Sequence, residues 1–270
     1  MNRVREGIVG VDFATREIIS KRYRKITKAV NLEFWNCESE MDHSLYVGSY
    51  GRGTATLASD LDVLISLPRE EYFRYDSYRG NGQSRLLQAV KSAILATYPT
   101  TDIKADGQVI VASFSDGMKF EILPAFDRCD FWGLSGGFDY PDSNMGGRWL
   151  ATYPKTEQEA MRGKNKESNG LLFDTCKHIR NIHKERFSSY KLSGIVIDSF
   201  VFSAIGNWRW IKGGSSIPAG AYEENLLEEF NRLSGYGLFP FSLKSPGGVQ
   251  AVDTEDSYSC LGKVLRTMMD

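Results

Sequence analysis

The chain has 270 residues, of which 41% are hydrophobic and 25% charged, as in an ordinary globular protein with one large domain or two lobes. Its formal net charge of −1 gives no electrostatic reason to expect constitutive binding to long nucleic acid. The apolar runs are too short to span a membrane, and the N-terminus lacks the apolar region of a secretory signal. We therefore expect a cytoplasmic protein without membrane attachment.

The first predicted element is a helix over 14–36. Apolar residues recur there at helical spacing, with basic residues between them. We expect this helix to act as a scaffold across the back of the lobe that follows.

The segment YVGSYGRGTATLASDLDVLISL at 46–67 carries the most informative pattern. Gly48-Ser49 forms a turn, and Asp60 and Asp62 follow on an apolar strand. Because residues i and i+2 of a strand point the same way, the two carboxylates project together. Adjacent carboxylates repel unless a cation lies between them, and oxygen ligands at this spacing suit Mg²⁺. Gly48 lets backbone approach a phosphate, and Ser49 adds a hydroxyl and an N–H, which predicts a nucleoside triphosphate site.

The chain then continues with a polar segment over 69–84, predicted to be a loop, and a helix from Ser84 to Tyr98. The sequence QVIVASFSDGMKFEILP at 108–124 predicts a hairpin, because two alternating apolar runs flank the strong turn signal Asp116-Gly117.

Glu121 is the best candidate for a third metal ligand. On the returning strand of the hairpin, Lys119, Glu121 and Leu123 share one face. A lone acid between Phe120 and Ile122 is unusual if that face is core. A surface glutamate beside Lys119 is the alternative.

Residues 127–150 are rich in Gly and Asp, contain Trp132 and Trp149, and have no clear period, so we expect a connector between two lobes. From 155 onward helical spacing dominates. The expected elements are helices over 156–166, 171–187, 196–212, 222–233 and 258–269, a break at 213–216 and a loop at 234–254. The predicted fold class is therefore α+β. A catalytic lobe over 1–140, a mixed sheet with helices, precedes a mainly helical lobe over 141–270, with the active site in the cleft between them.

Several other chemistries are excluded or unsupported by the residue spacing. The four cysteines are scattered without a Cys-x-x-Cys pair, so we expect buried thiols rather than a zinc site or disulfides. The three histidines form no metal-binding pattern, and nothing supports a Cys-His nucleophile. The glycines after Val47 match neither the Rossmann nor the P-loop motif.

These features together resemble the DNA polymerase β-like nucleotidyltransferase superfamily, with its Gly-Ser turn, Asp-x-Asp pair and third-strand acid. Within it, the chain is similar to the bacterial CD-NTases, which synthesise cyclic oligonucleotide signals and are relatives of cyclic GMP-AMP synthase and oligoadenylate synthase. The matching segments, in the family's order, are GSYGRGTA at 48–55, SDLDVLISL at 59–67, DGQVIVASFSDGMKFEILPAF at 106–126 and PDSNMGGRWLATYPKTEQEA at 141–160. Glu121 departs from the superfamily pattern, which more often has Asp there.

The resemblance implies a polymerase β-like catalytic lobe and a metal-dependent reaction. Asp60, Asp62 and Glu121 would hold two Mg²⁺ ions, with Mn²⁺ as an alternative, while nucleoside triphosphates (NTPs) are joined and pyrophosphate is released. The implied product is a cyclic di- or oligonucleotide second messenger in bacterial anti-phage signalling. The implied partners are NTP substrates, a regulatory protein and a downstream effector that binds the product.

The helical lobe must then help to bind the triphosphate. Residues 155–191 contain nine Lys or Arg against five Asp or Glu, and Lys177 and Arg180 share one face of a predicted helix. An arginine in so basic a stretch is not expected to be buried in a structural ion pair. The resemblance implies that these cations reach the triphosphate and that Ser189-Tyr190 contacts phosphate and stacks on the base. A solvated basic face, and ordinary core packing of Tyr190, are the alternatives.

Two other functions remain open from the sequence. One is a nucleotidyltransferase that acts on RNA ends or on a small acceptor such as an aminoglycoside. The other is a non-catalytic nucleotide-binding partner that retains the fold, although such a binder does not need three metal-ligating carboxylates.

Overall fold

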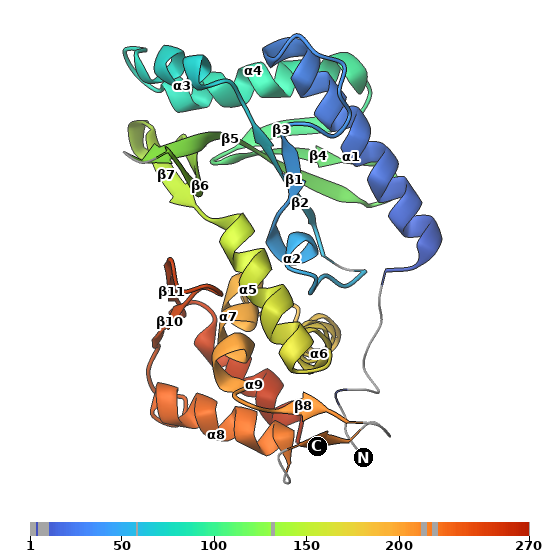
Figure 1. The fold of residues 1–270 in the computed structure, drawn as a ribbon, viewed down its shortest axis with the longest axis vertical. Helices are drawn as coiled ribbons and strands as arrows, with labels where there is room; N and C mark the ends of the chain where they lie inside the picture. The colour runs from blue at the N-terminus through green and yellow to red at the C-terminus, as the bar shows by residue number, and fades with distance from the viewer. Residues whose placement is uncertain are drawn as a thin grey trace. The chain divides into compact units, whose positions relative to one another are not determined.

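The structure is a computed structural model that describes residue 4 and residues 11–57, 59–130, 133–211, 215–217 and 221–269. It contains two compact units (Figure 1). The sheet unit comprises Asp12–Gly51 and Asp60–Lys155, and the helical unit comprises Arg52–Ser59 and Thr156–Asp270 with Val4.

The sequence-based boundary at 140/141 differs from the observed one at Lys155/Thr156. Residues 127–150 are not an irregular connector, because most of them belong to strands that continue the sheet. In addition, Arg52–Ser59, which links the Gly-Ser turn to the acid strand, belongs to the helical unit. Trp132, expected in the connector, lies outside the described residues.

In the described part of the sheet unit, seven strands form one mixed sheet in the order β1-β2-β5-β4-β3, with β6 paired to β5 and β7 paired to β6. Among the strand pairs of this described sheet, β2 and β5 are parallel and the others are antiparallel. The strands are β1 Ser44–Tyr46, β2 Leu61–Ser66, β3 Asp102–Asp106, β4 Val109–Ser113, β5 Lys119–Asp130, β6 Gly133–Asp142 and β7 Arg148–Thr152. The predicted hairpin is confirmed as β4 and β5, with Asp116 and Gly117 in its turn and Gly117 at φ 85°.

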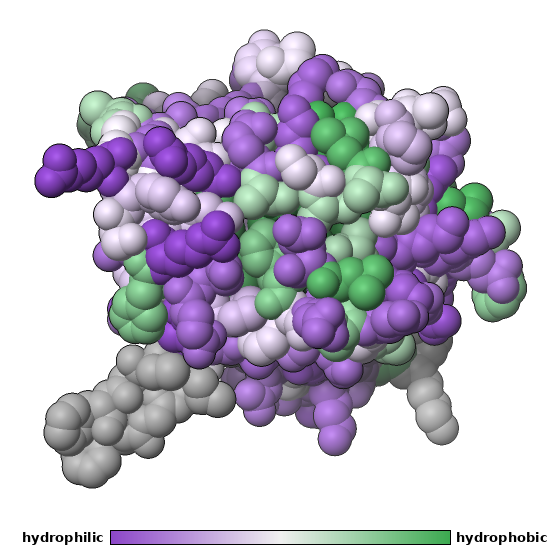
Figure 2. All heavy atoms as spheres, turned by 90° about the horizontal axis from the view of Figure 1, so that it is seen from above, coloured by the Kyte–Doolittle hydropathy of each residue, from purple (hydrophilic) through white to green (hydrophobic). Residues whose placement is uncertain are grey.

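The helices of the sheet unit are α1 Phe13–Phe34, α2 Gly48–Gly51, α3 Arg69–Asp76 and α4 Gly82–Thr97. The scaffold helix is confirmed as α1, which packs against α4 (Figure 1). Asp12 caps it by accepting a hydrogen bond from the Thr15 N–H at 2.9 Å. The predicted loop over 69–84 is wrong for α3, a polar helix that buries only Tyr75 and so shows no apolar stripe in sequence. On the face seen in Figure 2, apolar residues gather near the centre of the view and polar residues surround them.

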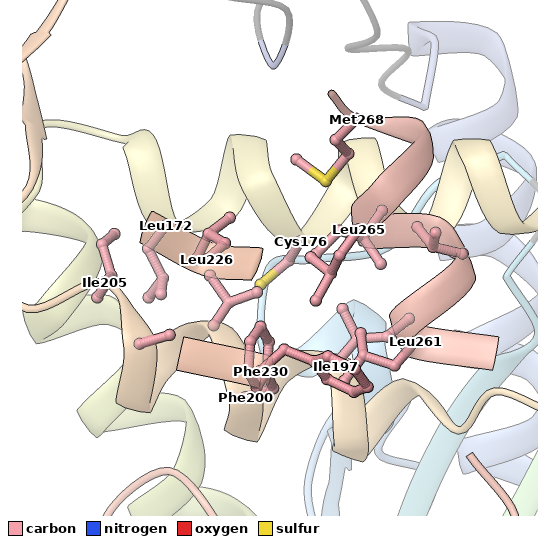
Figure 3. Close-up of a cluster of buried hydrophobic side chains, with 14 of the residues drawn as sticks. Leu172, Cys176, Ile197, Phe200, Ile205, Leu226, Phe230, Leu261, Leu265 and Met268 are labelled. Atoms are coloured by element: carbon pink, nitrogen blue, oxygen red, sulfur yellow. The ribbon is translucent and has the colours of Figure 1, made fainter. Parts of the chain in front are cut away.

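The helices of the helical unit are α5 Pro154–Glu167, α6 Leu171–Arg186, α7 Gly194–Ala204, α8 Tyr222–Ser234 and α9 Tyr258–Thr267. Their apolar faces meet in one core (Figure 3), which includes Leu172, Cys176, Phe200, Phe230, Leu261 and Leu265. Burial of these side chains supplies the main stabilising term of this unit.

Two predictions for the helical unit are wrong. The helix expected over 196–212 ends at Ala204, because the chain turns at Gly206, at φ 50°, into the short hairpin β8 Arg209–Trp210 and β9 Ser216–Ile217. The loop expected over 234–254 contains the hairpin β10 Ser242–Lys244 and β11 Ala251–Asp253. Residues 212–214, on which the predicted helix end and break fall, lie outside the described residues.

Three cysteines of the described chain are free thiols: Cys176 and Cys260 are buried, and Cys37 is partly buried. The side chain of Cys129 lies outside the described residues. None of the described helices is both long enough and apolar enough to cross a membrane.

Candidate functional site

Two of the predicted metal ligands lie side by side on the parallel pair of strands. Asp62 of β2 is the register partner of Glu121 of β5, so both side chains leave the same face of the sheet. Asp60 lies immediately before β2, two residues from Asp62. The neighbours Leu61 and Val63 are 4% and 0% exposed, which confirms the predicted alternation. The fold therefore gathers the three acids where these two strands begin.

The turn at Gly48 lies directly against one of these acids. Gly48 has φ 56°, and a Cβ atom built on it would stand 1.7 Å from Asp62 Oδ2. The adjacent Val47 N–H donates a hydrogen bond to the Asp62 carbonyl oxygen at 2.8 Å. Position 48 therefore requires glycine for two reasons, a left-handed backbone and the space taken by a carboxylate. Sequence reasoning placed Gly48 and Asp62 in one site, and the structure brings them into contact.

Lys119 is a charged neighbour of the acids that the sequence suggested only as a surface partner of Glu121. Its Nζ lies 2.6 Å from Glu121 Oε1 and 3.5 Å from Asp60 Oδ2. The hydrogen bond to Glu121, together with the negative charges of Glu121 and Asp60, raises the pKa of Lys119, although partial burial opposes the shift. The ammonium therefore links the two strands across the acid site.

The donor set suits a hard divalent cation. The side chains of Asp60, Asp62 and Glu121 offer only carboxylate oxygens, and Mg²⁺ binds such oxygens together with water and phosphate. In the described residues no three acidic, histidine or cysteine side chains converge closely enough to hold an ion as they stand. The chemistry of the three donors fits Mg²⁺, and the cation that now contacts two of them is the Lys119 ammonium.

Arg180 has a different environment from the one expected. It is only 8% exposed, and its Nη1 donates to Asp198 Oδ1 at 2.8 Å while its Nη2 donates to the Gly194 carbonyl at 2.9 Å. The expectation that this arginine would not be buried in a structural ion pair is wrong. The reason is tertiary: the facing helix α7 presents a fully buried carboxylate that needs a cation. Lys177, partly buried on the same helix α6, forms no ion pair with another described residue.

The partner of Arg180 belongs to a buried network that sequence reasoning missed. Asp198 Oδ2 accepts hydrogen bonds from Arg52 Nε at 2.7 Å and from the Thr54 hydroxyl at 3.0 Å, and Arg52 Nη1 contacts Glu157 Oε2 at 3.0 Å. Burial alone would raise the pKa of Asp198, but the charges of Arg180 and Arg52 hold it below its usual value. Arg52 and Thr54 lie within the segment GSYGRGTA, which was the only signal available, because Asp198 is 146 positions from Arg52.

Ser189 and Tyr190 follow α6, as the sequence predicts, and both are exposed. The Tyr190 ring is 48% exposed, and the Lys263 Nζ lies 3.6 Å from its centroid. Tyr190 is therefore not a core residue, and one face of its ring carries a cation. Whether these two residues contact a nucleotide remains a prediction.

Comparison with protein families decides the classification. Residues 8–165, more than half of the chain, match the model of the Second Messenger Oligonucleotide or Dinucleotide Synthetase domain. The chain belongs to this family. The match includes all three acids and the Gly-Ser turn. No curated protein sequence matches the chain.

Solved structures of similar fold agree with this family membership. A cyclic dinucleotide synthase CdnE from Elizabethkingia meningoseptica, solved with GTP and Apcpp, has a TM-score of 0.66 and 13% identity, over 93% of this chain and 89% of that one. A STING-associated CdnE c-di-GMP synthase from Capnocytophaga granulosa has a TM-score of 0.68 and 16% identity, over 98% and 83%. The CdnC:HORMA-deltaN complex from E. coli MS115-1 has a TM-score of 0.62 and 14% identity, over 99% and 86%.

These likenesses show the polymerase β-like α+β fold that the sequence predicts. The synthetase is a nucleotidyltransferase of the class that makes cyclic oligonucleotides. In this chain, the candidate active site consists of the turn at Gly48 and the three acids Asp60, Asp62 and Glu121.

Proposed function

We propose that this synthetase is a Mg²⁺-dependent nucleotidyltransferase that joins NTPs into a cyclic di- or oligonucleotide and releases pyrophosphate. The observation that carries the proposal is the register pairing of Asp62 with Glu121, with Gly48 packed against Asp62. A nucleotide-binding protein without catalysis has no use for a carboxylate trio that repels itself.

The three acids have one shared role, which is to hold two Mg²⁺ ions. When bound, Mg²⁺ supplies Lewis acidity at the acceptor hydroxyl and neutralises charge on the leaving pyrophosphate. Asp60 and Asp62 would hold both ions, and Glu121 chiefly the ion beneath the acceptor hydroxyl. Most of the rate enhancement would come from positioning and from charge neutralisation.

The remaining side chains bind the nucleotide. The backbone at Gly48 and the hydroxyl and N–H of Ser49 are the proposed phosphate contacts, because a glycine turn lets the chain approach an anion closely. Lys177 is the proposed cationic contact of the triphosphate from the helical unit, and Ser189 and Tyr190 are the proposed contacts with phosphate and base. Arg180 acts instead as a buried structural residue that supports the helix carrying Lys177.

Membership of the family supports a proposal for the biological setting. A second-messenger synthetase needs a receptor, so we propose a downstream effector that binds the cyclic product, within bacterial anti-phage signalling in the cytoplasm. The CdnC neighbour is solved in complex with a HORMA protein. This supports a regulatory protein as a candidate partner for the present chain.

The direct test is product analysis. We expect purified protein with four NTPs and Mg²⁺ to yield a cyclic product detectable by mass spectrometry, and Asp62→Asn to yield none while keeping the wild-type melting temperature. Labelling of an added RNA end or of a small acceptor, without a cyclic product, would indicate the other transferases. Nucleotide binding without turnover, under every metal and nucleotide tested, would indicate a non-catalytic protein.

A further inference from the structure

Lys119 and the three acids form two pairs on one face of the sheet, Asp60 beside Lys119 and Asp62 beside Glu121. Leu61 and Phe120 are register partners, and so are Asp62 and Glu121. One residue before the first of these pairs, Asp60 and Lys119 stand beside each other, and Lys119 Nζ lies 3.5 Å from Asp60 Oδ2. The same Nζ lies 2.6 Å from Glu121 Oε1. The Lys119 ammonium thus contacts one carboxylate of each pair.

This arrangement has an electrostatic consequence. Three carboxylates on neighbouring positions repel one another, and one lysine balances one of the three charges. Among the ion pairs of the described residues, Lys119 is the partner of both Asp60 and Glu121. A divalent cation bound by these carboxylates would have to occupy the oxygen atoms that the ammonium now contacts, and the two cations would repel each other at that distance.

Lys119 is also able to leave. Its side chain is 37% exposed, so part of its flexible stem already lies in solvent. An exposed ammonium loses little when it exchanges a carboxylate for water. The buried arginines of the helical unit differ from Lys119, because no solvent is at hand to replace their carboxylate partners.

We propose that Lys119 is a built-in counter-cation of the acid site. Its ammonium neutralises Asp60 and Glu121 while no metal is bound, and it is displaced when Mg²⁺ binds. Free Mg²⁺ therefore binds weakly, whereas Mg²⁺ that arrives with a triphosphate brings extra oxygen ligands and negative charge that offset the displacement. Lys119 thus makes the loading of metal depend on nucleotide. This inference rests on the proposed function, since it assigns the metal to the same acids.

The test measures metal binding directly. Mn²⁺ is titrated calorimetrically into nucleotide-free wild type and Lys119→Met, and again in the presence of a non-hydrolysable ATP analogue. We expect Lys119→Met to bind Mn²⁺ roughly fivefold more tightly without nucleotide, the size of one or two exposed ion pairs. The difference should shrink when the analogue is present. Lys119→Met should also melt at a lower temperature in chelator, because the acids then lack a counter-charge, and should gain more from Mn²⁺ than wild type does.

Two further variants make the result specific. Lys119→Arg keeps the positive charge and should retain the wild-type Mn²⁺ affinity. Lys104→Met removes an exposed lysine of β3 that pairs with Asp102 at 2.9 Å, and should change neither affinity nor the metal-dependent melting.

The outcomes separate the two proposals. Unchanged or weaker Mn²⁺ binding by Lys119→Met, with normal binding by wild type, overturns the counter-cation role and leaves the proposed function intact. Absence of Mn²⁺ binding by wild type and by Lys119→Met, even with the nucleotide analogue, contradicts the proposed metal site itself.

Discussion

Gly48 packs directly against the side chain of Asp62, so closely that a Cβ atom on Gly48 would stand 1.7 Å from Asp62 Oδ2. Arg52, the first residue of the segment that belongs to the helical unit, follows Gly48 after three residues. The turn proposed to bind phosphate and a carboxylate proposed to bind metal are therefore in direct contact in the fold.

We therefore expect Gly48→Ala to lower turnover by about 100-fold, the cost typical of displacing a catalytic group by an ångström. The matched control is Gly117→Ala. Gly117 also has a positive φ, 85°, but a Cβ there meets nothing within 4 Å, so only the backbone strain of about 1–2 kcal/mol is shared. Product formation and thermal melting are measured for both. Equal activity losses in the two variants would contradict the steric explanation.

Glu121→Gln should reduce cyclic product by more than about 100-fold, since it removes the charge of a proposed metal ligand rather than of a residue that merely supports one. The change preserves size, so the melting temperature should stay near that of wild type. Glu40→Gln, at an exposed position of the same unit, is the control and should retain full activity. Near-normal turnover by Glu121→Gln would mean that the third ligand lies elsewhere.

Arg180→Ala should destabilise the protein by about 3–5 kcal/mol, because it leaves the fully buried Asp198 with one fewer cation. Lys177→Ala should change stability by less than about 0.5 kcal/mol, yet raise the KM for NTP by about tenfold if its ammonium binds phosphate. Urea denaturation and steady-state kinetics on both variants separate the roles. An unchanged KM in Lys177→Ala removes this residue from the binding site.

Asp198→Asn should show a stability deficit that depends on pH in a defined direction. The pKa of Asp198 is lowered in the folded protein, so the charged form contributes stability above the ordinary carboxyl pKa of 3.8. That contribution disappears as pH falls through the lowered folded value. The difference in unfolding free energy between wild type and Asp198→Asn should thus be constant from pH 7 to about 5 and shrink below pH 3.8. A deficit that stays constant below that pH would contradict the assignment.

The sequence predicted those parts of the fold that have a local period. The helices α1 and α6 and the hairpin of β4 and β5 follow from spacing and a turn signal, and β2 follows from the apolar run around Asp62. The strand β6 was missed because its residues, GLSGGFDYPD, combine glycines with irregular polarity and so lack an alternating pattern. The helix α3 was missed for a related reason, since Phe73 is 62% exposed and no apolar face marks the helix.

The candidate site divides in the same way. The acids at 60, 62 and 121 were predicted because strand geometry fixes which side chains point together. The burial of Arg180 was not predictable, because it depends on Asp198, which lies on another helix 18 positions away. The bridging position of Lys119 depends on the parallel pairing of β2 with β5, a contact that no local pattern in the sequence specifies.

Because Arg52–Ser59 belongs to the helical unit, it limits how the polypeptide can be divided into fragments. A fragment spanning 12–155 would retain the acids and the Gly-Ser turn, but Arg52 would lose both Asp198 and Glu157 as partners. The residues between the two halves of the catalytic motif would then have no core of their own. The candidate site residues at 48–49 and 60–62 are thus separated along the chain by a segment that belongs to the helical unit, and we expect neither unit to fold as an independent fragment.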